Sequence, residues 1–235
     1  MRWAITLRAC GAHLLKAETI LQNIPLIIPQ TVEAYSRIAS AIANGGVIAF
    51  RTDTFYGLGA DPFNRDAIQR IKQLKGREGE KPILVVISDL EQVGRFISEL
   101  SPAFDLLARE FWPGPLTLIG RSAPGVPEEI TAGTETVGVR LPGDDAVRTL
   151  VQACGGALTA TSANPSDREP AKTAREVRKY FNDAVDLIVD GGDAKVDQPS
   201  TVVDARGVEA RLIREGAIPW SQIQAAIDQF KRDKC

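Results

Sequence analysis

The chain has 235 residues, 44% of them hydrophobic and 25% charged, which is a globular composition with enough sequence to enclose a substantial core. Lysine and arginine number 28 against 30 aspartate and glutamate residues, so the formal net charge of -2 gives no overall electrostatic footprint for nucleic acid or a membrane surface. Any anion site must therefore be local.

The cysteine and histidine content excludes several kinds of catalytic and metal site. Cys10, Cys154 and Cys235 lie far apart and form no CxxC pair, which argues against a zinc site and a disulfide framework. The single histidine, His13, lies outside any periodic stretch, so a Ser-His-Asp triad and an HExxH zinc motif are excluded. We expect no protein-held metal and a reducing, cytoplasmic location.

Neither a transmembrane span nor a signal peptide is expected. The longest uncharged run, residues 149–166, is rich in Gly, Thr, Ser and Asn, which do not form a membrane span. Charged residues interrupt the apolar residues of the N-terminal segment, which therefore lacks the core of a signal peptide. We predict a poorly ordered extension over residues 1–23 and one domain over residues 24–235.

Helical and strand patterns alternate along that domain without a linker or an internal repeat, which predicts a single α/β domain. Apolar spacing, capping residues and breakers predict helices over residues 31–44, 64–74, 102–111, 144–153 and 173–181, and a capping box at residues 88–91 opens another. Buried strands are predicted over residues 47–50, 83–87, 116–119, 136–141, 157–160, 187–189, 201–204 and 211–213.

The two common nucleotide-binding loops are missing. There is no GxxxxGK[ST], and the Gly-Leu-Gly of residues 57–59, read as following a strand, does not continue as GxGxxG. Other groups must hold any nucleotide. Polar groups gather in four stretches: residues 52–58, 75–77, 162–164, and 199–201 with Arg214.

Lys75 and Arg77 are two residues apart, so an extended chain would point both to one side. Together they could clamp a polyphosphate, because Arg offers a planar fork to phosphate oxygens and Lys a mobile point charge. The alternative is an exposed basic loop.

Ser162 and Asn164 have the same spacing directly after a predicted strand, where α/β folds commonly place ligand groups. We expect both to face one cleft, where a hydroxyl and an amide can donate to phosphate or carboxylate oxygens. The alternative is a simple turn, since Ser, Asn and Pro are turn residues.

Thr52, Asp53 and Thr54 also follow a buried strand, and their hydroxyls suit a small polar substrate beside an apolar wall from Phe55 or the next residue, Tyr56. Asp53 could equally cap the turn. Arg140 is a charge within an apolar run, which demands a carboxylate from inside the protein or from a substrate. The residues alone slightly favour an internal ion pair.

Seven stretches in order resemble the YrdC-like family. They are residues 52–59, 75–77, 112–117, 137–142, 161–166, 199–201 and 212–216, and the resemblance covers roughly residues 28–227. Each is weak alone, but the ordered set is specific, and the KxR and SxN signatures of the family's threonylcarbamoyl-AMP synthases are intact. Glu78 and Glu215 stand where relatives often have proline, and the length resembles the short form of the family.

The resemblance implies a twisted, mixed α/β sheet around a deep, positively lined cavity. It implies a synthase that joins L-threonine, bicarbonate and ATP, with Mg2+ carried by ATP, and that supplies a downstream threonylcarbamoyl transferase complex acting on tRNA. By the same resemblance Thr54 and Arg140 hold threonine, Lys75 and Arg77 are catalytic, and the ATP phosphates contact a larger set: Lys75, Arg77, Ser162, Asn164, Ser200 and Arg214.

Three other functions remain open. Family members have been discussed as RNA binders, although the near-neutral charge argues against strong independent binding and leaves a weak RNA contact at most. Carbamoyl transfer in hydrogenase maturation would need zinc-finger and acylphosphatase modules that this sequence lacks. A diverged enzyme of the same fold could use another acceptor.

Overall fold

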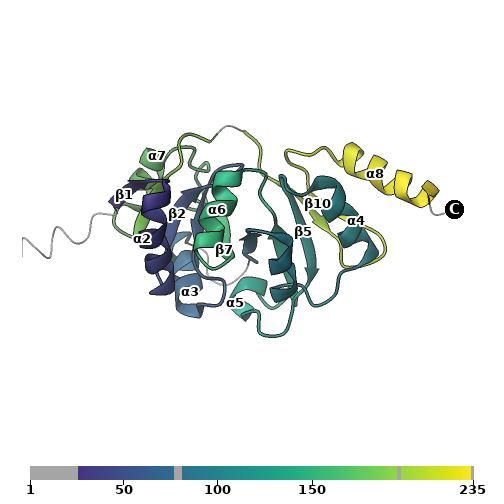
Figure 1. The fold of residues 1–235 in the computed structure, drawn as a ribbon, viewed down its shortest axis with the longest axis horizontal. Coiled ribbons are helices and arrows are strands. Elements are labelled where there is room, and N and C mark those ends of the chain that lie inside the picture. The colour runs from purple at the N-terminus through teal and green to yellow at the C-terminus, as the bar shows by residue number, and fades with distance from the viewer. Residues whose placement is uncertain (1–25, 77–80, 195–196, 234–235) are drawn as a thin grey trace, which may run out of the picture.

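The computed structural model describes residues 26–76, 81–194 and 197–233, and Figure 1 shows their arrangement. The strands are β1 (Leu26–Pro29), β2 (Ile48–Arg51), β3 (Tyr56–Gly59), β4 (Leu84–Ile87), β5 (Leu116–Arg121), β6 (Thr136–Arg140), β7 (Ala157–Ser162), β8 (Leu187–Asp190), β9 (Thr201–Asp204) and β10 (Arg211–Arg214). The helices are α2 (Val32–Ala43), α3 (Arg65–Leu74), the 3-10 helix η1 (Leu90–Arg95), α4 (Pro102–Phe111), α5 (Glu128–Thr131), α6 (Asp145–Ala153), α7 (Ala174–Phe181) and α8 (Trp220–Asp233).

The strands form one mixed sheet in the order β1-β8-β2-β3-β7-β4-β6-β5-β9-β10. Strand β7 joins its two halves, because its first four residues pair with β4 and its last two with β3. The pairs β1/β8, β2/β8, β4/β6 and β5/β9 are parallel and the others antiparallel. The expected twisted, mixed α/β sheet is confirmed.

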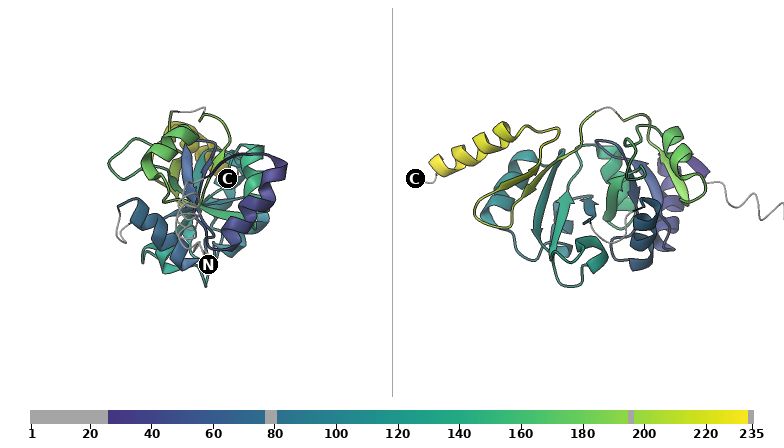
Figure 2. Two further views of the ribbon diagram at one scale, coloured as in Figure 1. Left: turned by 90° about the vertical axis from the view of Figure 1, so that its left-hand side faces the viewer. Right: turned by 180° about the vertical axis from the view of Figure 1, so that it is seen from behind.

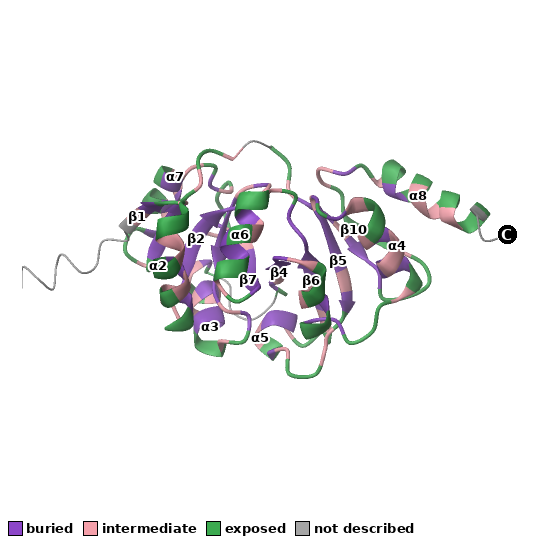
Figure 3. Cartoon of the chain, in the orientation of Figure 1, coloured by how far each residue is buried: buried purple, intermediate pink, exposed green. Residues whose placement is uncertain are grey.

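Alternating side chains of the strands divide the core into two layers. On β2, Ile48 and Phe50 pack in a cluster with α2 and α6, whereas Ala49 belongs to a second cluster with α3, α4 and α7. This alternation follows from the two-residue period of a strand. Figure 3 shows the result: the inner strands, such as β2 and β3, are buried, and the helices expose their outer surfaces.

The two ends of the sheet carry different helices. Helix α8 packs against α4 through buried Ile223, and Figure 1 and the right-hand view of Figure 2 place it at the opposite end of the molecule from α2. Among the described residues, no helix combines the length and apolar character needed to cross a bilayer.

Most predicted elements are confirmed, with end residues shifted by one to two positions. The five helices predicted from apolar spacing are α2, α3, α4, α6 and α7, and the eight strands are β2 and β4 to β10. The capping box at residues 88–91 was expected to open an α-helix, but only the short 3-10 helix η1 forms there. Its N-cap is Asp89, which accepts from the amide of Glu91, while Ser88 donates its hydroxyl to Asp89.

Residues 57–59 follow a strand, as the sequence indicated, but the strand that they form themselves was not predicted. They belong to β3, which forms a hairpin with β2 and pairs Phe50 with Gly57 and Ile48 with Gly59. Glycine has a low strand propensity, so the sequence pattern of these residues did not predict a strand. Here it allows close packing, since the ring of Phe50 covers Gly59.

The predicted extension over residues 1–23 lies outside the described residues, as do His13, Cys10, Cys235 and Arg77. The domain boundary at residue 24 stays a prediction.

We predict that Gly59→Ala lowers the free energy of unfolding by about 1 to 3 kcal/mol, as overpacking does. A methyl group there would lie 2.6 Å from Cε1 of Phe50 and 3.2 Å from the carbonyl oxygen of Thr159. Urea unfolding measures the change. The control is Gly94→Ala in η1, where a methyl group meets nothing within 4 Å; equal stability of the two variants would contradict the packing argument.

Candidate functional site

A cavity of about 470 Å³ lies where β3, β7, β4, β6, β5, β9 and β10 turn side chains toward one space. Its lining includes five residues that the sequence singled out: Thr54, Arg140, Ser162, Ser200 and Arg214. These residues come from five separate parts of the chain, and the sheet brings them together.

Arg140 supplies a buried positive charge to the cavity wall. Only 3% of its side chain is exposed, and Nη2 lies 3.1 Å from Oδ1 of Asp53, so the internal ion pair expected from the sequence is confirmed. The pair is not aligned for a hydrogen bond: Asp53 Oδ1 and Arg140 Nε are both buried without a hydrogen-bond partner among the described residues. Burial lowers the pKa of Arg140, and the charge of Asp53 opposes that change.

Two hydroxyls beside Arg140 form a fixed chain of hydrogen bonds. Thr52 Oγ1 donates to the carbonyl of Phe55 at 2.7 Å, so in its 3.0 Å contact with Thr54 Oγ1 the proton comes from Thr54. Nη1 of Arg140 donates to Thr54 Oγ1 at 3.4 Å. Thr54 Oγ1 thus retains one acceptor position for a ligand. The amide of Thr54 donates to Thr52 Oγ1, so Thr52 rather than Asp53 closes this turn.

Arg214 and Ser200 form a second polar group of the cavity. Nη2 of Arg214 donates to the carbonyl of Ser200 at 2.8 Å, and the hydroxyl of Ser200 lies 2.9 Å from that of Thr117. Desolvation lowers the pKa of Arg214, and the positive charge of Arg140 lowers it further. Two cations that repel each other across a cavity favour an anionic ligand placed between them.

The charges along the wall have one sign. Lys81 lines the cavity together with Arg140 and Arg214, whereas no carboxylate is among the described residues that line it. The positively lined cavity implied by the family resemblance is therefore present.

Lys75 lies behind this wall rather than on it. Its side chain is buried, and Nζ donates to the carbonyl of Asn164 at 2.9 Å and to that of Ser162, with Oδ1 of Asn164 at 3.3 Å. This ammonium group holds the end of β7, so the alternative of an exposed basic loop is wrong for Lys75.

The backbone at Lys75 and Gly76 differs from the extended chain that was expected. Lys75 is the C-cap of α3, with φ -85° and ψ -5°, and Gly76 has φ 65°. A helix end followed by a left-handed glycine turns the chain, so i, i+2 alternation does not apply there. Arg77 lies outside the described residues, and its placement stays a prediction.

Ser162 and Asn164 do not face the cleft together as expected. Ser162 lines the cavity, but Asn164 is buried behind it, where its amide nitrogen donates to the carbonyls of Pro165 at 2.9 Å and Arg168 at 2.5 Å. The backbone N–H of Asn164 also donates to the carbonyl of Ser162 at 2.9 Å, which shows that the chain bends instead of continuing as a strand. The predicted turn is therefore present, only Ser162 of the two lines the cavity, and their contact with a ligand stays a prediction.

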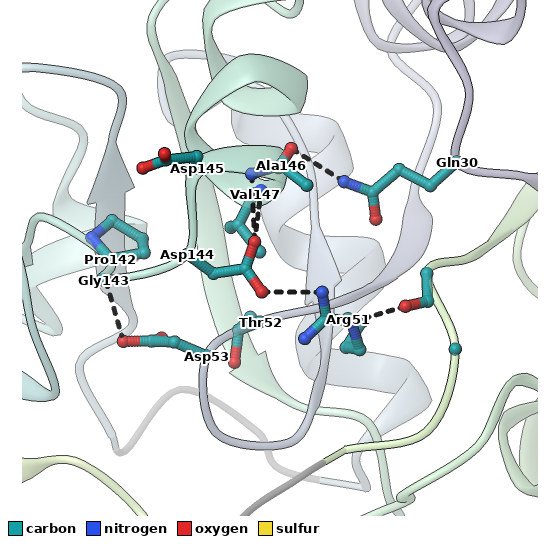
Figure 4. Close-up of polar contacts among 12 residues, drawn as sticks. Gln30, Arg51, Thr52, Asp53, Pro142, Gly143, Asp144, Asp145, Ala146 and Val147 are labelled. Atoms are coloured by element: carbon teal, nitrogen blue, oxygen red, sulfur yellow. Dashed lines mark hydrogen bonds and ion pairs between the residues drawn. The ribbon is translucent and has the colours of Figure 1, made fainter.

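Polar contacts join the end of β2 and the β2–β3 turn to the loop that precedes α6. Figure 4 shows Asp53 accepting from the amide of Gly143 and Arg51 pairing with Asp144. The Arg51 pair has Nη2 and Oδ2 2.7 Å apart, while Oδ1 of Asp144 caps α6 by accepting from the amides of Ala146 and Val147. These contacts fix the β2–β3 turn against the start of α6.

Residues 40–216 match the model of a family named Sua5, YciO and YrdC and described as telomere recombination. The match spans well over half of the chain. This chain belongs to the Sua5/YciO/YrdC family.

Relatives in this family bear the name threonylcarbamoyl-AMP synthase. The protein from Pyrococcus abyssi is 35% identical over 196 residues, which cover 83% of this chain and 58% of the relative. Those from Halorhodospira halophila and Marinobacter nauticus are 34% and 39% identical, over 72% and 68% of this chain and 88% and 85% of the relatives. The chain thus spans less than two thirds of the Pyrococcus relative's length and most of the other two.

Solved structures of the family share the fold. Sua5 from Pyrococcus abyssi in complex with L-threonine superposes with a TM-score of 0.82 at 32% identity, covering 87% of this chain and 61% of that one. YciO from Escherichia coli gives 0.74 at 23% identity, covering 83% and 98%. The second likeness concerns the fold alone.

Several residues that line the cavity were not predicted from the sequence. Thr117 could have been found, because it is a polar residue within the buried strand β5. Lys81 and Thr136 give no such signal, since exposed Lys and Thr are common. Gly138 also lines the cavity. A methyl group there would lie 3.1 Å from Thr117 Cγ2, so a larger residue would crowd Thr117 on the cavity wall.

We predict that Asp144 stabilises the fold in a pH-dependent way. Burial tends to raise the pKa of its carboxyl group. The hydrogen bond and positive charge of Arg51, together with the hydrogen bonds from the first amides of α6, lower this pKa by more, so it lies below the ordinary value of about 3.9. A lowered folded-state pKa gives stability that is present above the unfolded pKa and is lost as the pH falls through the folded pKa.

Asp144→Asn should therefore cost about 1 kcal/mol near neutral pH, and this difference from the natural protein should shrink below about pH 4. The asparagine can still cap α6 through its side-chain oxygen. Denaturant unfolding at several pH values measures the difference, and a constant difference across that range would contradict the ion-pair account.

Proposed function

We propose that this chain is a threonylcarbamoyl-AMP synthase, a nucleotidyltransferase that converts L-threonine, bicarbonate and ATP into threonylcarbamoyl-AMP and pyrophosphate. The observation that carries the proposal is the cavity whose wall contains buried Arg140 and, beside Ser200, Arg214. Six synthases of this name are 34–39% identical to the chain over most of its length.

Arg140 and Thr54 suit the amino acid. The Nε of Arg140 is a buried donor without a hydrogen-bond partner among the described residues, and a substrate carboxylate would satisfy it. The hydroxyl of Thr54 offers one acceptor position nearby for a hydroxyl or amine proton. The structure of the Pyrococcus Sua5 with L-threonine makes threonine the first amino acid to test.

The remaining polar groups suit the phosphates of ATP. Arg214, Ser200 and Ser162 line the cavity and bring a cation and two hydroxyls to it. Lys75 and Asn164 support the wall at Ser162, and their contact with phosphate requires the end of β7 to open toward the ligand. We assign Lys75 and Arg77 the catalytic role of following negative charge from the α-phosphate to the departing pyrophosphate.

The reaction needs positioning more than acid-base groups. The threonine amine combines with bicarbonate to give a carbamate, water leaves, and a carbamate oxygen then attacks the α-phosphorus while the bond to pyrophosphate breaks. Arginine, lysine and hydroxyl donors in a desolvated cavity stabilise the charge that develops on the phosphate oxygens. This inventory requires no histidine.

Mg2+ would enter with ATP and offset the charge of its phosphates. The described lining has cations and hydroxyls but no carboxylate, so phosphate oxygens and water would supply the metal's ligands. This donor set fits an ion carried by the nucleotide rather than one held by the protein.

In the cell we place this enzyme in the cytoplasm, where its product would pass to a threonylcarbamoyl transferase complex that modifies tRNA. RNA binding without catalysis is the weaker alternative, because Lys81, Arg140 and Arg214 line a concave cavity and the net charge is -2.

The proposal predicts pyrophosphate release that depends on threonine. Purified protein is incubated with ATP, Mg2+ and bicarbonate, with L-threonine, L-serine or no amino acid, and pyrophosphate is measured. Threonine should give the fastest release, and omission of bicarbonate should abolish it. Release that is the same with and without an amino acid, or no release at all, would overturn the proposal.

We predict that Arg214→Met raises KM for ATP by about tenfold or more, because a charge-assisted hydrogen bond to phosphate is lost. KM for threonine should change far less. Arg211→Met is the matched control, since Arg211 lies on the same strand, is exposed and does not line the cavity. Equal effects of the two substitutions on KM for ATP would contradict the placement of phosphate at Arg214.

A further inference from the structure

We infer that Asp53 is a positioning residue for the carboxylate of the amino-acid substrate: it holds the guanidinium group of Arg140 in place without touching the substrate. The inference rests on the function proposed above, because it concerns the same cavity. It adds a residue to which neither the sequence motifs nor the relatives assign this role.

The contacts of Arg140 leave N–H donors of its guanidinium group unused, Nε–H among them. Nη2 lies 3.1 Å from Oδ1 of Asp53, and Nη1 donates to Oγ1 of Thr54 at 3.4 Å. Nε is buried and has no hydrogen-bond partner within the described part of the chain. Asp53 and Thr54 thus hold the two terminal nitrogens, and the orientation they impose decides where Nε points.

Asp53 is itself fixed from a second direction. Its Oδ2 accepts from the backbone amide of Gly143 at 3.3 Å, and its side chain is only 10% exposed. Gly143 precedes Asp144, whose ion pair with Arg51 joins the same two loops (Figure 4). The carboxylate therefore transmits the position of the loop before α6 to the guanidinium group.

Asp53 acts behind the cavity wall. Thr52 and Thr54, its neighbours along the chain, line the cavity, whereas Asp53 does not. A negative charge on the wall would repel a substrate carboxylate. A negative charge behind Arg140 instead compensates the buried cation and leaves the cavity side of the guanidinium group without a carboxylate. This arrangement separates the residue that binds the anion from the residue that orients it.

A purely structural role for Asp53 makes a different prediction. If the carboxylate only joined the β2–β3 turn to Gly143, its loss would lower the free energy of unfolding and leave the affinity for threonine unchanged. The control for this reading is Asp144→Asn, which breaks the neighbouring Arg51 ion pair between the same loops but does not contact Arg140.

The test compares Asp53→Asn with Asp144→Asn in the full chain. An amide has no negative charge and replaces one carboxylate oxygen by an NH2 donor, so it can keep the bond from the Gly143 amide but not the ion pair with Arg140. We expect Asp53→Asn to raise KM for threonine by about tenfold or more, with KM for ATP changed less than about twofold. Asp144→Asn should leave both values near those of the natural protein.

A double-mutant cycle shows whether Asp53 acts through Arg140. In the Arg140→Met background, Asp53→Asn should cause no further loss of threonine affinity, measured by calorimetry with L-threonine, because the group it positions is gone. It should also raise the midpoint of thermal unfolding, because it removes a buried unpaired carboxylate. Additive losses of affinity, or an unchanged KM for threonine in Asp53→Asn alone, would overturn the inference.

A crystal structure of Asp53→Asn separates this inference from the proposed function. A displaced guanidinium group supports positioning even if the natural protein releases no pyrophosphate with threonine, a result that would refute only the proposed reaction. A guanidinium group in its original place refutes positioning, whatever the reaction. If Asp53→Asn alone does not fold, folding of the Asp53→Asn/Arg140→Met double variant would support the coupling, and failure of both would count against it.

Discussion

The buried charge of Arg140 is the constraint on which the cavity depends. A guanidinium group that is 3% exposed needs a counter-charge, and Asp53 supplies it from the turn between β2 and β3. That turn is held to the loop before α6 by Gly143 and Asp144. The β2–β3 hairpin, strand β6 and helix α6 are therefore linked through these contacts.

The parts of the fold that could be predicted were those with a strong local pattern. Amphipathic helices such as α3 and α6 have an apolar face and a capping residue, and the buried strands have short apolar runs between turns. Strand β3 was missed because two of its four residues are glycines. Its strand structure comes from pairing with β2 and from the ring of Phe50 over Gly59, which are contacts that a local pattern does not contain.

The candidate site was predictable where a residue conflicts with its surroundings. An arginine within an apolar strand requires a partner, and this identified Arg140 before its pairing with Asp53 was known. The geometry of Lys75 could not be inferred, because spacing in the sequence assumes an extended chain and a helix ends there instead. Contacts such as that between Thr117 and Ser200 join residues 83 positions apart, and only the sheet order brings them together.

We propose that the carboxylate of the amino-acid substrate binds to the guanidinium group of Arg140. The most direct measurement is calorimetric titration of the protein, in the presence of ATP and Mg2+ but without bicarbonate, with L-threonine and with L-threoninol, which replaces the carboxylate by an alcohol. If Arg140 binds the carboxylate, we expect saturable binding of L-threonine and at least about tenfold weaker binding of L-threoninol. Equal binding of the two compounds would contradict it.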